Sequence, residues 1–332
     1  MSHKPRRSIA TLATACGHAG EQAITPAAAE KPQLATAYTL PSDRAYPESI
    51  TVDAKTGATY VSSYLTGEVF RAAPNTDAAE IFLPAGAEGR NTANGVKVDP
   101  AGRLWVIDST KGVAVYDTST RALLAQFAAT GTDRFFVNDL VFTPDGTAYL
   151  TDSVRPVLYR VTPAQFDTAR ANGGHGDLIA AFDLGSALAP HAPDAYNLNG
   201  VVADAAGRYL LVVDMTGGDL YRVSLAPGDN APIRRVTLRG DDLKGTDGME
   251  LRGETLWAAQ NSANAISRWH IGDDGASATE EQRFTDPGLA IPTSLVHRGD
   301  ELLVAASQFD KGGPFGPGTP NRPFRVLKVS GI

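Results

Sequence analysis

A short sequence unit recurs six times along this chain and limits the folds open to it. Each copy has an apolar segment, a tight turn and further apolar segments: residues 94–108 read NGVKVDPAGRLWVID, and residues 138–152 read NDLVFTPDGTAYLTD. Apolar residues that alternate between such turns predict β-hairpins rather than helices. Repeats of about 40 to 50 residues with several strands each are typical of propeller blades. We therefore predict an all-β protein, a six-bladed β-propeller over residues 33–332.

The chain ends predict how the ring closes. The sixth unit offers only three good strands, and one further strand is predicted before the first unit, over residues 34–40. We expect this N-terminal strand to complete the outer edge of the last blade, which leaves no open sheet edge between the chain ends.

Residues 1–32 lack this alternation, and we expect a disordered leader or the remnant of an export signal. The segment Lys4-Pro5-Arg6-Arg7 is followed by a short, weakly apolar stretch that ends at Cys16. This is the order of an export signal, at the short end of the usual length. It favours an extracytoplasmic location slightly over a cytoplasmic one.

Charge and cysteine content exclude several classes of partner. The 332 residues include 30 basic and 37 acidic side chains, and the net charge is −7 without any basic block, which argues against nucleic-acid binding. No apolar run approaches the roughly 18 residues that would span a bilayer. A single cysteine excludes a cysteine-rich zinc site. We expect a monomer that acts on a small molecule.

The residue that opens each unit has a side-chain oxygen in every copy. In a propeller the innermost strands begin at one face of the central channel, so the six residues should encircle the axis. Carboxylates, amides and a hydroxyl form a hard-oxygen set that suits Ca²⁺ or another divalent cation. The six positions are Glu48, Asn94, Asn138, Asn199, Asp247 and Thr293.

Tight turns are the alternative explanation for three of these positions. Asn-Gly and Asp-Gly are common turn dipeptides, and they occur at Asn94-Gly95, Asn199-Gly200 and Asp247-Gly248. However, they occupy one register of the repeat, and Glu48-Ser49 and Asn138-Asp139 occupy the same register without glycine. This pattern favours a metal site.

With Glu in the first unit, Asn-Asp in the third, Asn-Gly in the fourth and Asp-Gly-Met in the fifth, the chain resembles the gluconolactonase and senescence-marker-protein family. It is similar, more distantly, to the paraoxonases and diisopropylfluorophosphatase. The resemblance implies a six-bladed propeller with axial calcium that acts on lactones or phosphotriesters. It matches Glu48, Asn138, Asn199 and Asp247 to the metal ligands, whereas Asn94 has no assured counterpart and is expected to contact the substrate or the ligands.

An axial cation beside a carboxylate suits ester hydrolysis. The resemblance places the catalytic carboxylate in the fifth blade, so we assign Asp247 as general base or nucleophile. The second strands end in a further polar set that includes Asp152 and Asp214. These two side chains contact either the ligands and substrate or the adjacent turns.

Two longer connections have the character of pocket rims. The first lies between the third and fourth units; it contains a helix predicted over residues 163–170, which we expect to cap the pocket, and His191, a candidate pocket residue. The second is the Pro- and Gly-rich loop over residues 311–320.

We therefore predict a calcium-dependent hydrolase of the lactonase or esterase class. The alternatives are a non-catalytic binding propeller of the NHL type and a biosynthetic propeller catalyst or lyase, because fold does not determine function.

Overall fold

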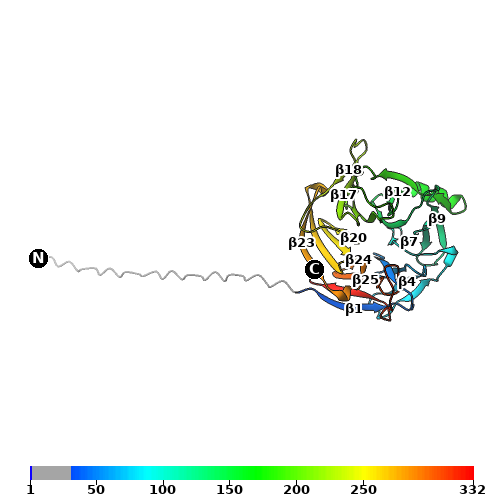
Figure 1. Ribbon diagram of the computed structural model, residues 1–332, viewed down its shortest axis with the longest axis horizontal. Coiled ribbons are helices and arrows are strands. Elements are labelled where there is room, and N and C mark those ends of the chain that lie inside the picture. Colours follow the sequence, from blue (N-terminus) through cyan, green and yellow to red (C-terminus); the bar gives the residue numbers. More distant parts are fainter. Residues whose placement is uncertain (2–30) are drawn as a thin grey trace. The chain divides into compact units, whose positions relative to one another are not determined.

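The computed structural model describes Met1 and residues 31–332. Among these residues, six mainly antiparallel sheets lie around a central axis, which confirms the predicted six-bladed propeller (Figure 1). The expected leader falls almost wholly outside the described residues.

Each of the first three blades has four antiparallel strands, and the second has an additional outer strand that pairs in parallel. Blade 1 contains β2 (Pro47–Val52), β3 (Thr59–Ser63), β4 (Val69–Ala72) and β5 (Glu80–Leu83); blade 2 contains β6 (Val96–Val98), β7 (Arg103–Asp108), β8 (Gly112–Asp117), β9 (Leu123–Ala128) and β13 (His175–Asp177); blade 3 contains β10 (Val137–Phe142), β11 (Ala148–Asp152), β12 (Val157–Val161) and β14 (Ile179–Asp183).

The last three blades follow the same plan, and blade 5 has a parallel outer strand. Blade 4 contains β15 (Leu198–Ala203), β16 (Tyr209–Asp214), β17 (Asp219–Ser224) and β18 (Ile233–Arg235); blade 5 contains β20 (Thr246–Arg252), β21 (Thr255–Gln260), β22 (Ala265–Gly272), β23 (Ser277–Thr285) and β19 (Thr237–Arg239); blade 6 contains β24 (Pro292–Arg298), β25 (Glu301–Ala306), β26 (Arg325–Ser330) and β1 (Gln33–Thr39).

Strand β1 closes the ring, as the sequence predicts. It pairs antiparallel with β26, from Gln33 opposite Ser330 to Thr39 opposite Arg325. Beyond this strand the backbone continues along blade 1, where Thr39 exchanges hydrogen bonds with the 77–79 segment. The N-terminal strand therefore contacts both the last blade and the first.

The hydrophobic core is divided into six clusters, one at each junction between neighbouring blades. Large rings near the start of the second strands pack there in three blades: Tyr60, Trp105 and Tyr149 are buried. Trp257 is half-buried against the ring of His297. Burying such rings supplies much of the apolar area that holds a propeller together.

The predicted helix forms, but in a different place from the one we expected. Helix α1 (Pro163–Ala171) begins with a capping box between Thr162 and Gln165, which satisfies two otherwise free backbone N–H groups. Its Phe166 packs against Trp105 of blade 2, with ring centroids 6.1 Å apart. The helix therefore fills the junction between blades 2 and 3, and none of its residues lines the axial cavity described below.

The other helices within residues 31–332 are three short 3₁₀ turns, η1 (Ala87–Gly89), η2 (Asp273–Gly275) and η3 (Pro287–Leu289). None of the helices in the part of the chain that the structure describes is long and apolar enough to cross a bilayer.

Candidate metal centre and active site

Five of the six predicted ring residues come together at the floor of one axial cavity of about 200 Å³. They are Glu48, Asn94, Asn138, Asn199 and Asp247, and all five are at most 6% exposed. The sixth, Thr293, is also buried, but its hydroxyl donates a hydrogen bond to the Pro47 carbonyl at 3.2 Å. Five ring side chains are therefore available to a ligand, whereas the sixth is hydrogen-bonded to the backbone.

Irregular backbone pairing marks the start of the inner strands. In blades 1, 3, 4 and 5 the register shifts at the ring residue, for example between Leu198 and Val201 around Asn199. Such bulges redirect a side chain that regular alternation would place elsewhere. This local distortion brings the oxygen-bearing side chains to the axis.

Close backbone packing explains the glycines that follow three of the ring residues. A Cβ atom on Gly95 would lie 2.6 Å from the Asn138 carbonyl oxygen, and one on Gly200 would lie 2.5 Å from that of Asp247. Neither glycine has a positive φ, so the turn interpretation of these dipeptides is wrong. Glycine is required because the next blade's ring residue approaches too closely for a side chain.

Three ring oxygens are buried without a hydrogen-bond partner among the described residues: Oε2 of Glu48, Oδ1 of Asn94 and Oδ1 of Asn138. Each such atom costs about 1–3 kcal/mol if it stays unpaired. Three such oxygens at one cavity floor match the ligand chemistry of a hard cation that takes oxygen ligands. The residues present therefore fit calcium.

The electrostatics of the floor also favour a cation. Burial raises the pKa of Glu48 well above its usual range, and the neighbouring carboxylates Asp247 and Asp139 raise it further, against the effect of Lys97. Burial raises the pKa of Asp247 to about 7, although hydrogen bonds from Asn261 and Asn199 lower it. Both shifts arise mainly because burial disfavours the charged form of a carboxyl group, and neighbouring carboxylates add to the effect.

The cavity residues that sequence reasoning missed include Tyr64, Met215 and Asn261. Each lies one residue beyond the end of a second strand. Asn261 donates from Nδ2 to Oδ2 of Asp247 at 3.2 Å, and Asn199 donates to the Met215 sulfur at 3.2 Å. Side chains alternate along a strand, so the residue after the strand end, rather than the last strand residue, was the position to test.

The polar last residues of the second strands form hydrogen bonds with adjacent turns and do not reach the cavity. Asp152 accepts hydrogen bonds at 2.9 Å from the backbone N–H groups of Phe136, Val154 and Arg155, and at 2.9 Å from the Tyr159 hydroxyl. Asp152 is fully buried and does not line the axial cavity. Its contacts match the turn-binding alternative for this position.

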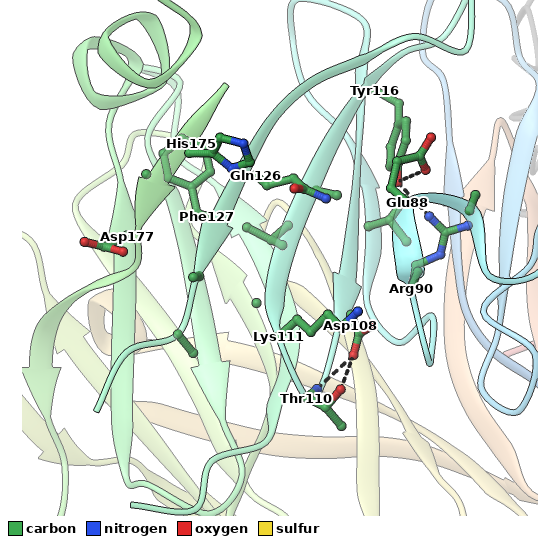
Figure 2. A pocket seen from close by; sticks show the side chains of 18 of the residues that line it. Glu88, Arg90, Asp108, Thr110, Lys111, Tyr116, Gln126, Phe127, His175 and Asp177 are labelled. Atoms are coloured by element: carbon green, nitrogen blue, oxygen red, sulfur yellow. Dashed lines mark hydrogen bonds between the residues drawn. The ribbon is translucent and has the colours of Figure 1, made fainter. Parts of the chain in front are cut away.

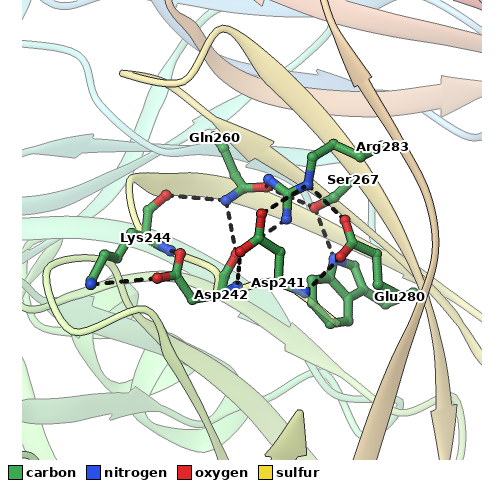
Figure 3. Close-up of polar contacts among 8 residues, drawn as sticks. Asp241, Asp242, Lys244, Gln260, Ser267, Glu280 and Arg283 are labelled. Carbon is green, nitrogen blue, oxygen red and sulfur yellow. Dashed lines mark hydrogen bonds and ion pairs between the residues drawn. The ribbon is translucent and has the colours of Figure 1, made fainter. Parts of the chain in front are cut away.

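In blade 5 the last residue of the second strand is an amide, Gln260, and it also binds an adjacent loop. Gln260 donates from Nε2 to the carbonyls of Asp242 and Lys244, at 3.2 and 3.1 Å, and its Oε1 accepts from Ser267 and Arg283 (Figure 3). This network fixes the 241–245 segment just before the strand that carries Asp247.

Asp214 and His191 form a pair beside the cavity. Nε2 of His191 lies 2.6 Å from Oδ2 of Asp214, whose Oδ1 accepts from the Gly217 N–H at 2.9 Å. Neither side chain lines the cavity. The pair fastens the connection before blade 4 to the end of β16, and this connection carries Tyr196, which does line the cavity.

A larger cavity, of about 670 Å³, lies against blade 2 and contains none of the ring residues (Figure 2). Several of its polar groups already have partners. Arg90 donates to the Tyr116 hydroxyl at 2.7 Å, this hydroxyl donates to Glu88 at 3.0 Å, and Asp108 accepts from Thr110. These groups already have hydrogen-bond partners, unlike the oxygens at the floor of the axial cavity. The larger volume of this cavity is therefore not enough to make it the functional site.

Comparison with known proteins places this geometry in a family. Residues 46–279 match the family model described as SMP-30/Gluconolactonase/LRE-like region. No curated protein matches the chain.

Solved structures share the fold at low sequence identity. A gluconolactonase from Xanthomonas campestris is 15% identical with a TM-score of 0.61 and covers 90% of this chain and 89% of its own. Regucalcin from Agrobacterium tumefaciens, a calcium-binding protein, is 16% identical with a TM-score of 0.60. The match covers 87% of this chain and 91% of regucalcin. Virginiamycin B lyase from Staphylococcus aureus is 13% identical with a TM-score of 0.54. The match covers 90% of this chain and 99% of the lyase. At these identities the likeness concerns the fold.

The family match spans more than half of the chain and includes Glu48, Asn138, Asn199 and Asp247. The chain therefore belongs to the SMP-30/gluconolactonase/LRE-like family.

Proposed function

We propose that this protein is a calcium-dependent hydrolase of lactones or carboxylic esters. Family membership supports a lactonase-type hydrolase. The observation that carries the calcium requirement is the group of unpartnered, buried oxygens on Glu48, Asn94 and Asn138 at the cavity floor.

Glu48, Asn138, Asn199 and Asp247 hold the cation in this proposal. The two carboxylates supply two negative charges, and the amides supply neutral oxygens, a combination typical of calcium sites. Asn94 reaches the same floor from blade 2, so it either adds a fifth ligand or binds the substrate oxygen. When bound, calcium would polarise the ester carbonyl and stabilise the negative charge that develops on its oxygen.

Asp247 either takes a proton from the water that attacks the scissile carbonyl or attacks this carbonyl itself. Its carboxylate lines the cavity, and Asn261 holds Oδ2 in place. A buried carboxylate with one oriented oxygen is well placed for either role. Glu48 has no such hydrogen-bonded partner on Oε2, and its main contribution is charge.

Chelation and the Asp247→Asn variant test this proposal together. We expect removal of calcium to abolish lactone hydrolysis, readdition to restore it, and calcium to raise the melting temperature by binding the folded state. Asp247→Asn is expected to lower kcat by about 100-fold or more, because general-base and nucleophilic groups contribute on that order.

Asp300→Asn makes the same exchange at an exposed turn and should leave turnover unchanged. Unaltered hydrolysis in Asp247→Asn, or in the calcium-free protein, contradicts the proposal. Stabilisation by calcium without turnover of any ester supports the binding propeller instead, and elimination products in place of hydrolysis products support the lyase.

A further inference from the structure

Aromatic side chains from four separate segments build the walls above the candidate metal centre. Tyr64 follows β3, Phe136 precedes β10, Tyr196 precedes β15, and Phe309 and Phe315 come from the loop between β25 and β26. Met215 and Pro314 complete the lining. The cavity thus has a polar floor and predominantly apolar walls.

These rings are packed against one another in two groups. Phe309 contacts Tyr64 and Phe315 at centroid distances of 5.5 and 5.3 Å. Phe136 and Tyr196 meet edge to face at 5.0 Å. Because each ring is supported by another, the walls need little reordering to receive a ligand, which lowers the entropic cost of binding.

The outer rings are exposed to solvent to an unusual degree. Among the described phenylalanine, tyrosine and tryptophan residues, Tyr196 and Phe315 are the two that are exposed, at 38% and 54%. Both lie at this cavity. Exposed apolar groups that gather at one concave site mark a surface that binds a ligand.

Charge in the cavity is limited to the floor. In the described part of the chain, Glu48 and Asp247 are the charged side chains of the lining, and no lysine, arginine or histidine lines it. The guanidinium of Arg134 lies 5.9 Å from the Tyr196 ring centroid, outside the lining. A divalent cation would balance the two carboxylates, so the loaded site offers no excess positive charge to an anionic substrate.

We propose that the preferred substrate is an uncharged lactone or ester with an aromatic or alkyl substituent that lies between the two aromatic walls. This inference rests on the hydrolase function proposed above. A cavity of about 200 Å³ is smaller than the roughly 300–1,000 Å³ pockets that hold drug-sized ligands, so the substrate is compact. Sugar-derived lactones with many hydroxyls, and lactones with a carboxylate, find few partners on these walls.

Substrate pairs that differ only in the substituent provide the first test. We expect kcat/KM for γ-phenyl-γ-butyrolactone to exceed that for γ-butyrolactone by about 10-fold, because the substituent gains contact with the rings. The carboxylated analogue and glucono-δ-lactone should not exceed the unsubstituted parent. Faster turnover of either polar lactone than of the phenyl compound overturns the inference while leaving the hydrolase intact.

Removal of one exposed ring provides the second test. Phe315→Ala is expected to lower kcat/KM for the phenyl lactone about 5-fold to 10-fold and to lower that for γ-butyrolactone by a smaller factor. Because Phe315 is exposed, the variant should keep the melting temperature of the parent. Ile179→Ala, which removes an apolar side chain that is 49% exposed on β14, is the matched control. An equal loss on both substrates contradicts the proposal.

Binding of an unreactive analogue separates this inference from the proposed activity. Calorimetry with the calcium-loaded protein should show tighter binding of 5-phenylpyrrolidin-2-one than of pyrrolidin-2-one, and Phe315→Ala should reduce the difference. If this preference holds but no lactone is hydrolysed, the apolar recognition stands and the hydrolase proposal fails. If lactones are hydrolysed without any preference for the phenyl compounds, the recognition proposal fails alone.

Discussion

The glycines that follow Asn94, Asn199 and Asp247 show how a single residue shapes the candidate site. The sequence presents them as parts of turn dipeptides, yet they lie where the backbone of the neighbouring blade comes closest. At Gly248 a Cβ atom would lie 2.9 Å from the Thr293 carbonyl oxygen. The blades thus contact one another at the axis through bare backbone, which lets the ring oxygens converge.

Gly200→Ala tests this close approach. The new methyl group would overlap the Asp247 carbonyl oxygen, so the inner strands must separate, at a cost of about 1–3 kcal/mol of unfolding free energy. We also expect weaker calcium binding, because the shift moves Asp247. Thermal unfolding and calcium titration measure both effects. Gly316→Ala is the control, since its Cβ would have an ordinary contact at 3.5 Å; equal behaviour of the two variants would refute the explanation.

The residues at the strand ends illustrate the limit of pattern reading at this scale. Asp152 and Asp214 occupy one register of the repeat, as the sequence indicates, but they accept hydrogen bonds from turns. Asn261 reaches Asp247 from the next position. Whether a side chain at the end of a strand points to the axis or to a turn depends on local twist and bulges, and these do not appear in residue identity.

At the scale of elements, the long connection between β12 of blade 3 and β15 of blade 4, which includes β14, serves two purposes. Its first part forms α1 and β13, which extend the packing of blade 2. Its second part reaches the cavity with Tyr196 and is fastened by the pair of His191 and Asp214. A prediction from length alone assigned the whole connection to the pocket, whereas only its last residues lie there.

His191→Ala tests the fastening role. Loss of the imidazole leaves Oδ2 of a fully buried Asp214 without its partner, which costs about 1–3 kcal/mol. We expect faster proteolysis within residues 185–197 and weaker binding of apolar analogues, because Tyr196 loses its support. His270→Ala, at an exposed strand position, should leave both properties unchanged. Proteolysis of His191→Ala at the rate of the parent protein would rule out this role.

The whole molecule depends on a closed ring. Strand β1 covers the edge of β26, and its Tyr38 is 1% exposed and hydrogen-bonded to Thr59 of blade 1 at 2.7 Å. Leu40 is also buried. The two ends of the sequence are thereby joined without a covalent bond, and an unpaired edge is avoided.

A chain that begins at Tyr46 should be much less stable than one that begins at Pro32. The shorter chain lacks Tyr38 and Leu40, whose burial contributes about 3–6 kcal/mol together, and it exposes the edge of β26. We expect a lower melting temperature and greater aggregation, measured by calorimetry and light scattering. Equal melting temperatures would show that β1 is dispensable for ring closure.

The sequence alone determined the architecture of this protein, because the fold repeats. The same strands and turns are indicated by six copies of one pattern. The sequence was therefore enough to predict the number of blades, the closing strand and the shared register of Glu48, Asn138, Asn199 and Asp247. Repetition averages out the ambiguity of any single segment.

Only the tertiary structure decided which oxygens are left without partners, why glycine follows three ring residues, and which rings wall the cavity. Tyr64, Phe136, Tyr196, Phe309 and Phe315 occupy no common position in the repeat, and they meet because separate loops converge at one face of the ring. Such contacts join residues far apart in sequence, and they depend on bulges and close packing that local patterns do not encode.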